Sequence, residues 1–342
     1  MSGSSHQTQP IESVLITGAD GYVGRLLVTA LANADLRLRR VVATDLRLPP
    51  PARRLPGIVY ESLDVRSRDA AALMAEHGVD SVIHLAAVVS PGRKPNRELL
   101  YDVEVRGTEN LLECCLEARV GHFVVTSSGA AYGYHADSPV PLDEEDPLRG
   151  NETFAYSHHK RLVEEMLARY RTEHPEIEQL VLRPGTILGR TTHNQITALF
   201  EKRAVLGLSG IESPFVLIWD EDVVGAILHG LRGRRQGIYN LAGDGVLTMG
   251  EMARLMGKPY VELPSELVEG ALYGLHALAL SPYGPEQVDF LRYRPVLGNR
   301  RLKEELGYLP RKTTREVFDL YLRAKGLDGV ARSLDGKGGS RG

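Results

Sequence analysis

The stretch Ser13-Val14-Leu15-Ile16-Thr17-Gly18-Ala19-Asp20-Gly21-Tyr22-Val23-Gly24 decides the fold of this chain. Its first five residues form an apolar run that is typical of a buried parallel strand. Three glycines follow with G-x-x-G-x-x-G spacing, and residues 25–33 have the pattern of a helix. Glycines here allow a tight turn and a close approach of the backbone to a pyrophosphate, which the helix N-terminus attracts. This order predicts a dinucleotide-binding unit, with a plain turn as the alternative.

A second strand is expected at 40–44, and it ends at Asp45, which lies 21 residues after Gly24. A carboxylate at this distance accepts hydrogen bonds from the adenosine ribose hydroxyls and repels a 2′-phosphate. Asp45 therefore predicts NAD rather than NADP as the cofactor. Two features weaken the inference, because Arg47 is a nearby cation and Asp45 can instead cap the loop that follows it.

Strand-like apolar runs alternate with helical patterns along the first half of the chain. Such alternation predicts an α/β fold with a doubly wound parallel sheet of the Rossmann type. The other expected strands are 58–63, 81–87, 122–126 and 181–183, and the other expected helices are 67–77, 96–119 and 153–171. His84 lies within one of these strands, and we expect it to be a satisfied core histidine rather than a catalyst.

Four parts of the chain are expected from these patterns. Residues 1–11 are polar and are expected to be a disordered leader, and the glycine-rich residues 329–342 a disordered tail. Residues 12–185 are expected to form an NAD-binding Rossmann domain that carries the catalytic residues. Residues 186–328 are expected to form a smaller, mainly substrate-binding α/β portion whose late strands return to the main sheet.

Composition narrows the class of protein. A formal net charge of −3 over 342 residues gives no electrostatic reason to expect nucleic acid as a partner. No run of about 18 apolar residues occurs, so an integral membrane protein is not expected. The two cysteines, Cys114 and Cys115, are adjacent in an expected helix and poorly placed to bridge one another. With no signal peptide in the polar leader, we expect a cytoplasmic protein.

The strongest catalytic signal is Tyr156 with Lys160, because residues four apart lie on one face of a helix. A phenol has a pKa of about 10, and a nearby ammonium favours the phenolate and lowers that value. Ser127 and Ser128 end an expected strand, where a hydroxyl can reach the same substrate oxygen. This set is suited to taking a proton from an alcohol while hydride leaves for a nicotinamide. Tyr-x-x-x-Lys alone is also common on ordinary helices.

Further cofactor contacts are expected where strands end, because ligands of open parallel sheets bind outside the carboxyl ends. Asp64 and Val65 follow the third strand and are placed to meet the adenine ring, or Asp64 caps the next helix. Leu85, Ala86 and Ala87 are small or apolar residues at a strand end, which lets a cofactor approach the backbone. No metal site is expected.

These motifs occur in one order, and together they resemble an extended short-chain dehydrogenase/reductase of the NAD-dependent epimerase/dehydratase family. The similarity covers roughly residues 12–325 and is nearest to the branch of UDP-glucose 4-epimerase-like proteins. The motifs are Gly18-x-x-Gly21-x-x-Gly24, Asp45, His84-Leu85-Ala86-Ala87, Gly107-Thr108-x-Asn110-Leu111-Leu112, Ser127-Ser128-x-x-x-Tyr132-Gly133, Tyr156-x-x-x-Lys160 and Arg183-Pro184-Gly185.

The resemblance assigns roles to particular residues. It makes Tyr156 the base, Lys160 its activator and a ribose ligand, and Ser128 the partner of the substrate hydroxyl. Ser128 is preferred to Ser127 because it lies four residues before Tyr132, as in the family pattern. The expected substrate contacts are Ser128, Tyr132 and Asn194, although Asn194 is equally an N-cap. The expected NAD contacts are Gly18, Asp20, Gly21, Tyr22, Val23, Gly24, Asp45, Asp64, Val65, Leu85, Ala86, Ala87, Tyr156, Lys160, Arg183 and Pro184.

The chain also departs from the family pattern. Glu104 stands where the family usually has an asparagine, and it either substitutes electrostatically or disturbs the solvent relay of the lysine. Gly129 and Ala130 occupy the places where a 4,6-dehydratase carries its acidic residues, which argues against that reaction. Residues 267–280 are unusually apolar and form a lid, an apolar substrate site or a surface contact. Arg292 or Arg294 binds a diphosphate, or serves only a surface ion pair.

Three functions follow from these observations. The first is an NAD-dependent epimerase that acts on a secondary alcohol of a nucleotide sugar, of the UDP-hexose 4-epimerase type, through a transient ketone. The second is an NAD-dependent alcohol dehydrogenase or ketone reductase on a non-nucleotide, apolar substrate. The third, a non-catalytic NAD-binding regulator, is disfavoured because Ser128, Tyr156 and Lys160 are all present. The resemblance also implies a homodimer formed through helices 96–119 and 153–171.

Overall fold

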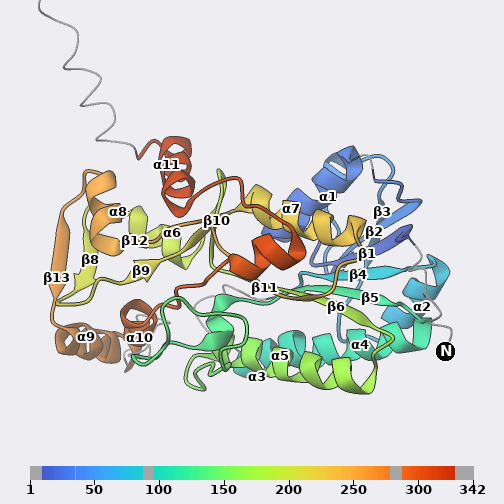
Figure 1. Ribbon diagram of the computed structural model, residues 1–342, viewed down its shortest axis with the longest axis horizontal. Helices are drawn as coiled ribbons and strands as arrows, with labels where there is room; N and C mark the ends of the chain where they lie inside the picture. Colours follow the sequence, from blue (N-terminus) through green and yellow to red (C-terminus); the bar gives the residue numbers. More distant parts are fainter. Residues whose placement is uncertain (1–9, 35, 88–95, 278–286, 328–342) are drawn as a thin grey trace, which may run out of the picture.

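The computed structural model describes residues 10–34, 36–87, 96–277 and 287–327 (Figure 1). The predicted tail, all but residues 10 and 11 of the predicted leader, and residues 278–280 of the apolar segment lie outside these ranges. Cys114 and Cys115 are free, as predicted, and both are buried. Within the described ranges, we find no helix that combines the length and the apolar character needed to cross a membrane.

A seven-stranded parallel sheet forms the centre of the fold, in the order β11-β6-β5-β4-β1-β2-β3 (Figure 1). After β3 the chain returns to the other side of β1, which is the topological switch of a doubly wound sheet. This arrangement confirms the predicted Rossmann-type fold. The strands are β1 (Ser13–Thr17), β2 (Arg40–Asp45), β3 (Val59–Ser62), β4 (Ser81–His84), β5 (His122–Thr126), β6 (Glu178–Pro184) and β11 (Gly237–Leu241).

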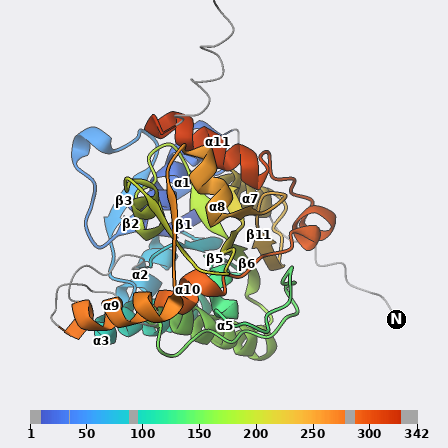
Figure 2. The same cartoon turned by 90° about the vertical axis from the view of Figure 1, so that its left-hand side faces the viewer.

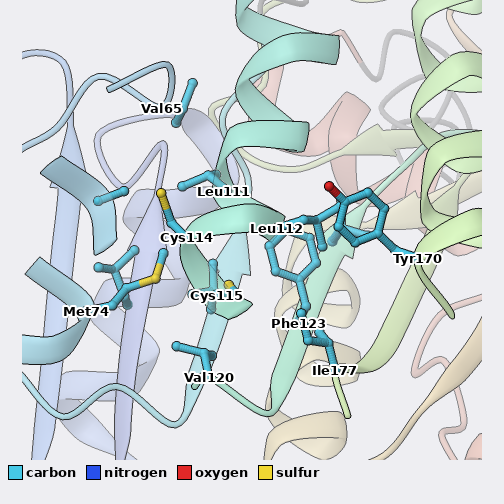
Figure 3. Packing of buried hydrophobic residues seen from close by; sticks show 14 of the residues in the cluster. Val65, Met74, Leu111, Leu112, Cys114, Cys115, Val120, Phe123, Tyr170 and Ile177 are labelled. Atoms are coloured by element: carbon cyan, nitrogen blue, oxygen red, sulfur yellow. The ribbon is translucent and has the colours of Figure 1, made fainter. Parts of the chain in front are cut away.

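Helices cover both faces of this sheet, and each layer buries its own apolar core. In Figures 1 and 2, α1 (Tyr22–Asn33) and α7 (Asp220–Arg232) lie on one side of the sheet and α5 (Ala155–Glu173) on the other. The layer of α5 also holds α2 (Asp69–Glu76) and α4 (Gly107–Ala118). Figure 3 shows part of the core in this layer, where Leu112, Cys115 and Phe123 are 0% exposed.

The helix predicted over 96–119 is present, but it is not uniform. Asn96 caps its start by accepting a hydrogen bond from the Leu99 N–H, and α3 (Arg97–Tyr101) follows. A π-helical turn over Asp102–Arg106 then joins α3 to α4. π-helical turns inside α-helices are often found at functional sites. This one carries Glu104, the residue that departs from the family pattern.

A second portion is built mainly after residue 185 and lies beside the main sheet in Figure 1. It contains three two-stranded sheets, and its apolar core is distinct from the two cores of the main sheet. The paired strands are β7 (Thr186–Leu188) with β10 (Leu217–Trp219), β8 (Val205–Leu208) with β13 (Tyr260–Leu263), and β9 (Pro214–Phe215) with β12 (Leu247–Thr248). The helices are α6 (Gln195–Phe200), α8 (Met249–Leu255), α9 (Ser265–Ala277), α10 (Gln287–Arg292) and α11 (Thr314–Lys325).

The last strand of the main sheet connects the two portions. β11 comes late in the sequence but pairs in parallel with β6, with Tyr239 opposite Leu182. This pairing confirms that a late strand returns to the main sheet. Three short helical turns complete the described elements, at Pro51–Arg53, Gly129–Tyr132 and Leu302–Leu306.

Candidate active site

The glycine turn after β1 has the geometry that its sequence predicts. Gly18 has a φ of +71°, and a Cβ there would lie 2.7 Å from the Ala86 nitrogen, so the turn packs directly against the end of β4. A Cβ at Gly24 would overlap the Gly18 carbonyl oxygen. Within the described chain, no side chain caps the first turn of α1 at Gly21. Its N–H groups therefore remain suited to a phosphate.

Asp45 closes this turn from the end of β2. Its Oδ2 accepts a hydrogen bond of 3.0 Å from the Asp20 N–H, and its Oδ1 one of 3.5 Å from the Arg47 N–H. The Asp20 carboxylate in turn pairs with Arg53 at 3.0 Å. Asp45 is therefore held beside the glycines, and its contact with a ribose stays a prediction.

Asp64 and Val65 lie beyond β3, and their polar groups have partners within the protein. Arg66 donates to both carboxylate oxygens of Asp64, at 2.9 Å from Nε and 2.6 Å from Nη2, and this lowers the pKa of Asp64. The Val65 carbonyl accepts a hydrogen bond of 2.8 Å from Asn110 Nδ2. These contacts leave the proposed adenine contact untested.

Lys160 joins the helix that carries Tyr156 to the carboxyl end of β5, from which the chain continues to Ser128. Lys160 Nζ donates a 3.1 Å hydrogen bond to the Thr126 carbonyl and lies 5.8 Å from the centre of the Tyr156 ring. Ser128 follows two residues after Thr126, where its hydroxyl accepts from the Ala130 N–H at 3.1 Å. The lysine is buried, whereas Tyr156 and Ser128 remain partly exposed. Lys160 is thus held between Tyr156 and the strand end that precedes Ser128, and the catalytic roles of these residues stay predictions.

His84 is a neutral structural residue. Its Nδ1 lies 2.7 Å from Thr17 Oγ1 and its Nε2 lies 3.0 Å from Thr108 Oγ1. Burial, together with the nearby Lys160 cation, lowers the pKa of His84 to about 3. A permanently uncharged ring therefore joins β4 to β1 and α4, which confirms the core assignment.

Two residues with predicted ligand contacts are buried and have partners within the protein. Arg183 is 3% exposed, and its Nε lies 2.9 Å from both carboxylate oxygens of Glu164, so its contact with a cofactor stays a prediction. Tyr132 is 1% exposed, and its contact with a substrate stays a prediction. Its hydroxyl accepts from Arg183 Nη1 at 2.7 Å and lies 2.9 Å from Asn240 Oδ1. Pro184 ends β6 directly after this arginine.

The interior network continues to Glu144, which sequence reasoning did not identify. The Glu144 carbonyl accepts a 3.0 Å hydrogen bond from Arg183 Nη1, and its Oε1 accepts one of 2.7 Å from the Asn240 N–H. Burial, with a smaller effect of Asp143, raises the pKa of Glu144 to about 7. No local pattern around residue 144 marks it, because its partners come from β6 and β11.

Glu104 is buried beside α5. Its Oε2 lies 2.8 Å from Nδ1 of His159, the residue before Lys160, and both side chains are at most 6% exposed. The ring of Tyr101 meets the His159 ring edge-on, with the centroids 5.6 Å apart. The π-helical turn therefore directs Glu104 toward α5, where it contacts a histidine.

Arg294 is placed differently from Arg292. Arg292 forms ion pairs with Glu269 at 2.9 Å and with Asp289 at 3.4 Å. For Arg292 the structure therefore shows the ion pair that was expected as the alternative to a diphosphate contact. The Arg294 guanidinium carbon lies 4.0 Å from the Phe215 ring centre and 4.4 Å from that of Phe290. Its Nη2 donates to Thr186 Oγ1 at 2.9 Å. Its Nη1 is buried without a hydrogen-bond partner among the described residues.

A group of aromatic rings extends from Arg294 toward Tyr156, and the sequence did not single it out. Phe290 packs against Tyr134 and Phe154, with ring centroids 5.2 and 5.9 Å apart. Phe154 in turn lies 6.5 Å from Tyr156. The sequence offered one sign of this group, because Phe154 lies two residues before Tyr156. The contact of Phe154 with α10 joins distant parts of the chain and is not visible in the sequence.

Tyr22 and Asn194 both have internal partners. The Tyr22 hydroxyl donates to Asp220 Oδ2 at 2.5 Å and accepts from Thr192 Oγ1 at 2.8 Å, so it joins the glycine turn to the second portion. Asn194 caps α6 by accepting from the Ile196 and Thr197 N–H groups at 2.9 Å. The N-cap alternative for Asn194 is confirmed, and a substrate contact by it stays a prediction.

Comparison with known proteins adds a family and several relatives. The sequence model described as "NAD dependent epimerase/dehydratase family" matches residues 14–242. An uncharacterized protein of Mycobacterium tuberculosis is 27% identical over 342 residues, which is 98% of this chain and 90% of that protein. A UDP-glucose 4-epimerase of Erwinia amylovora is 32% identical over 183 residues, covering 50% of this chain and 52% of that enzyme.

A 3-beta-hydroxysteroid dehydrogenase of Mycolicibacterium neoaurum is 25% identical over 343 residues, covering 89% of each chain. Among solved structures, UDP-glucose 4-epimerase with UDP-glucose from Thermotoga maritima has a TM-score of 0.70 at 20% identity. That match covers 92% of this chain and 99% of the other. A likeness at this identity reflects the shared fold.

We predict that the Glu144→Gln variant becomes more stable, relative to the unmodified protein, as the pH rises. A folded-state pKa of about 7, above the ordinary 4.5, means that the folded chain holds more protons than the unfolded chain between these values. The stability of the native protein therefore falls as the pH rises through this window, by roughly 3 kcal/mol in all. Glutamine has no charge and keeps the oxygen that accepts from Asn240. Denaturant unfolding at pH 5 and pH 8 measures the difference.

The exposed neighbour Glu145 supplies the matched control, because Glu145→Gln removes the same charge without burial. Its effect on the free energy of unfolding should be nearly equal at the two pH values. The same stability difference at pH 5 and pH 8 for Glu144→Gln would contradict the assignment.

Proposed function

Because the chain belongs to the NAD dependent epimerase/dehydratase family, with NAD as its cofactor, we propose that it is an epimerase of the UDP-hexose 4-epimerase type. The observation that carries the proposal is the meeting of Tyr156, Lys160 and Ser128 at the end of β5. β5 is separated from the glycine strand β1 only by β4, a span of roughly 10 Å at ordinary strand spacing. A dinucleotide bound at the glycine turn can therefore extend to Tyr156.

Each catalytic residue has a defined task in this proposal. Tyr156 accepts the proton of a secondary hydroxyl and later returns it, while Ser128 holds the same oxygen by a hydrogen bond. The Lys160 cation favours the phenolate form of Tyr156. When bound, NAD would supply the nicotinamide to which the carbinol carbon transfers hydride and from which the hydride is returned. Between the two hydride transfers the ketone rotates and presents its other face. Because the hydride is removed and then returned, an epimerase has no net redox change.

Arg294 supports a substrate that carries a diphosphate. Burial lowers the pKa of Arg294 to about 10, so the guanidinium stays charged at neutral pH. Its stacking between Phe215 and Phe290 fixes its plane, and Nη1 still has a hydrogen bond to give. A guanidinium held in this way suits a phosphate oxygen. The aromatic group from Phe290 to Phe154 leads from this cation to Tyr156.

An NAD-dependent alcohol dehydrogenase on an apolar substrate is the second candidate. It is supported by α9, on which the side chains of Leu267 and Tyr273 are 63% and 68% exposed. The full-length similarity to a 3-beta-hydroxysteroid dehydrogenase is in line with this candidate.

A substrate screen with Tyr156→Phe tests the proposed function. We expect the unmodified chain to interconvert a UDP-hexose with its 4-epimer, and to release NAD on acid denaturation as purified. Tyr156→Phe should lower turnover by at least about 100-fold with NAD binding unchanged, because the general base is lost. Reactions are followed both for epimer by chromatography and for NADH by absorbance at 340 nm.

The two candidates give opposite results in this screen. If NADH forms from an apolar alcohol and no UDP-hexose is interconverted, the epimerase proposal is wrong and the dehydrogenase candidate is supported. Turnover retained in Tyr156→Phe would remove Tyr156 as the base for either reaction.

Asp45→Ala is expected to reduce the preference for NAD over NADP. The carboxylate beside the glycine turn is placed to accept from the ribose hydroxyls and to repel a 2′-phosphate. The ratio of the two dissociation constants, measured by calorimetry, should fall by about 10-fold or more. An unchanged ratio would refute this role, and exposed Asp69→Ala on α2 serves as the control for loss of charge.

A homodimer through α4 and α5 is also part of the proposal, from the family resemblance. Light scattering of the purified chain should give twice the mass of 37.6 kDa. A monomer at micromolar concentration would contradict it.

A further inference from the structure

The segment that carries Ser128 is held by side chains as well as by the backbone. It leaves β5 at Ser127 and continues as the short helical turn Gly129–Tyr132. The Ala130 carbonyl in this turn accepts a 2.6 Å hydrogen bond from Ser157 Oγ. Ser127 Oγ donates at 2.5 Å to the carboxylate of Glu164. The segment is thus tied on both sides of Ser128.

Both ties lead to the helix that carries the catalytic tyrosine. Ser157 directly follows Tyr156, and Glu164 lies one turn beyond Lys160 on α5. Residues 156, 160 and 164 share one stripe of the helix, because their spacing is four. Any shift of α5 relative to β5 would therefore break the same hydrogen bonds that hold the Ser128 segment.

The Ser157 hydroxyl is both a donor and an acceptor at this junction. It is 0% exposed, donates to Ala130 and accepts from the Asn151 N–H at 3.1 Å. A Cβ at Gly150 would overlap the Ser157 carbonyl oxygen, so the loop before α5 packs tightly here. Ser157 therefore joins three segments around the site, namely the Ser128 turn, the loop at 150–151 and α5.

Glu164 is fixed in turn by the buried arginine of β6. Its Oε2 lies 2.5 Å from Arg183 Nη2, and both side chains are at most 4% exposed. The pair cannot turn toward solvent without leaving a buried charge unpaired, which costs several kcal/mol. The Ser127 hydroxyl therefore bonds to a carboxylate whose position is set by β6.

We propose that Ser157, with the Ser127–Glu164 tie, is a positioning residue that sets the distance between the Ser128 hydroxyl and the Tyr156 phenol. The inference rests on the proposed function, in which both groups contact one substrate oxygen. A displacement of about 1 Å between catalytic groups can cost about 100-fold in rate. Neither Ser157 nor Ser127 itself contacts the substrate in this proposal.

The test compares Ser157→Ala with Ser81→Ala. Ser81 is also 0% exposed and bonds to a side chain, His122 Nδ1 at 2.8 Å, but it starts β4 at the opposite end of the sheet. We expect similar losses of thermal stability for the two variants. Only Ser157→Ala should lower kcat, by about 10- to 100-fold, with KM and the NAD dissociation constant within about twofold of the unmodified values.

Hydrogen exchange supplies a readout that needs no substrate. The amides of Ala131 and Gly133 donate to Ser128 and Ala130 carbonyls at 3.0 Å, so they report directly on the turn. Exchange in a peptide covering 127–133 should be faster in Ser157→Ala and in Ser127→Ala, and unchanged in Ser81→Ala. Should Ser157→Ala not fold, Ser127→Ala, which cuts the second tie, is tested in the same two ways.

The outcomes separate this inference from the proposed function. Unchanged exchange at 127–133, or a kcat no lower than that of Ser81→Ala, overturns the positioning role. If the unmodified chain turns over no substrate, the proposed function fails by that result alone, and exchange at 127–133 then decides whether Ser157 holds the segment.

Discussion

The hydrogen bond from the Lys160 ammonium to the Thr126 carbonyl is the contact on which the site depends. It joins the helix that carries Tyr156 to the strand that delivers Ser128. A buried ammonium needs a hydrogen-bond acceptor, because an unpaired buried charge is destabilising. The carbonyl at the end of β5 provides this acceptor for Lys160. The same contact keeps the cation 5.8 Å from the phenol ring. Base, cation and hydroxyl therefore form one unit with the central sheet.

Much of the main sheet and its glycine turn was predictable from the sequence, because the patterns that indicate these elements are local. Residues 13–17 and 122–126 are short apolar runs bounded by breakers, and both are strands over these bounds. The glycines at 18, 21 and 24 are required by a positive φ or by close backbone contacts, which the spacing alone indicated. Tyr156 and Lys160 lie on one helix, so their proximity follows from a spacing of four.

The interior of the site was not predictable, because its contacts join distant parts of the chain. Tyr132 bonds to Asn240, 108 residues away, and Arg183 bonds to Glu164 across two elements. Sequence reasoning therefore assigned Tyr132 and Arg183 to ligands, whereas both are buried. Arg294 was one of two equal candidates, and only its stacking on Phe215 and Phe290 separated it from Arg292.

The pairing of β11 with β6 has a consequence for the architecture of the chain. β6 ends at Pro184, but its outer neighbour comes only at Gly237–Leu241, after β7, α6, β8, β9, β10 and α7. A fragment that stops near residue 185 would leave the whole outer side of β6 unpaired, and such an edge is a template for aggregation. The main sheet is therefore completed only by a strand that lies within the later part of the chain.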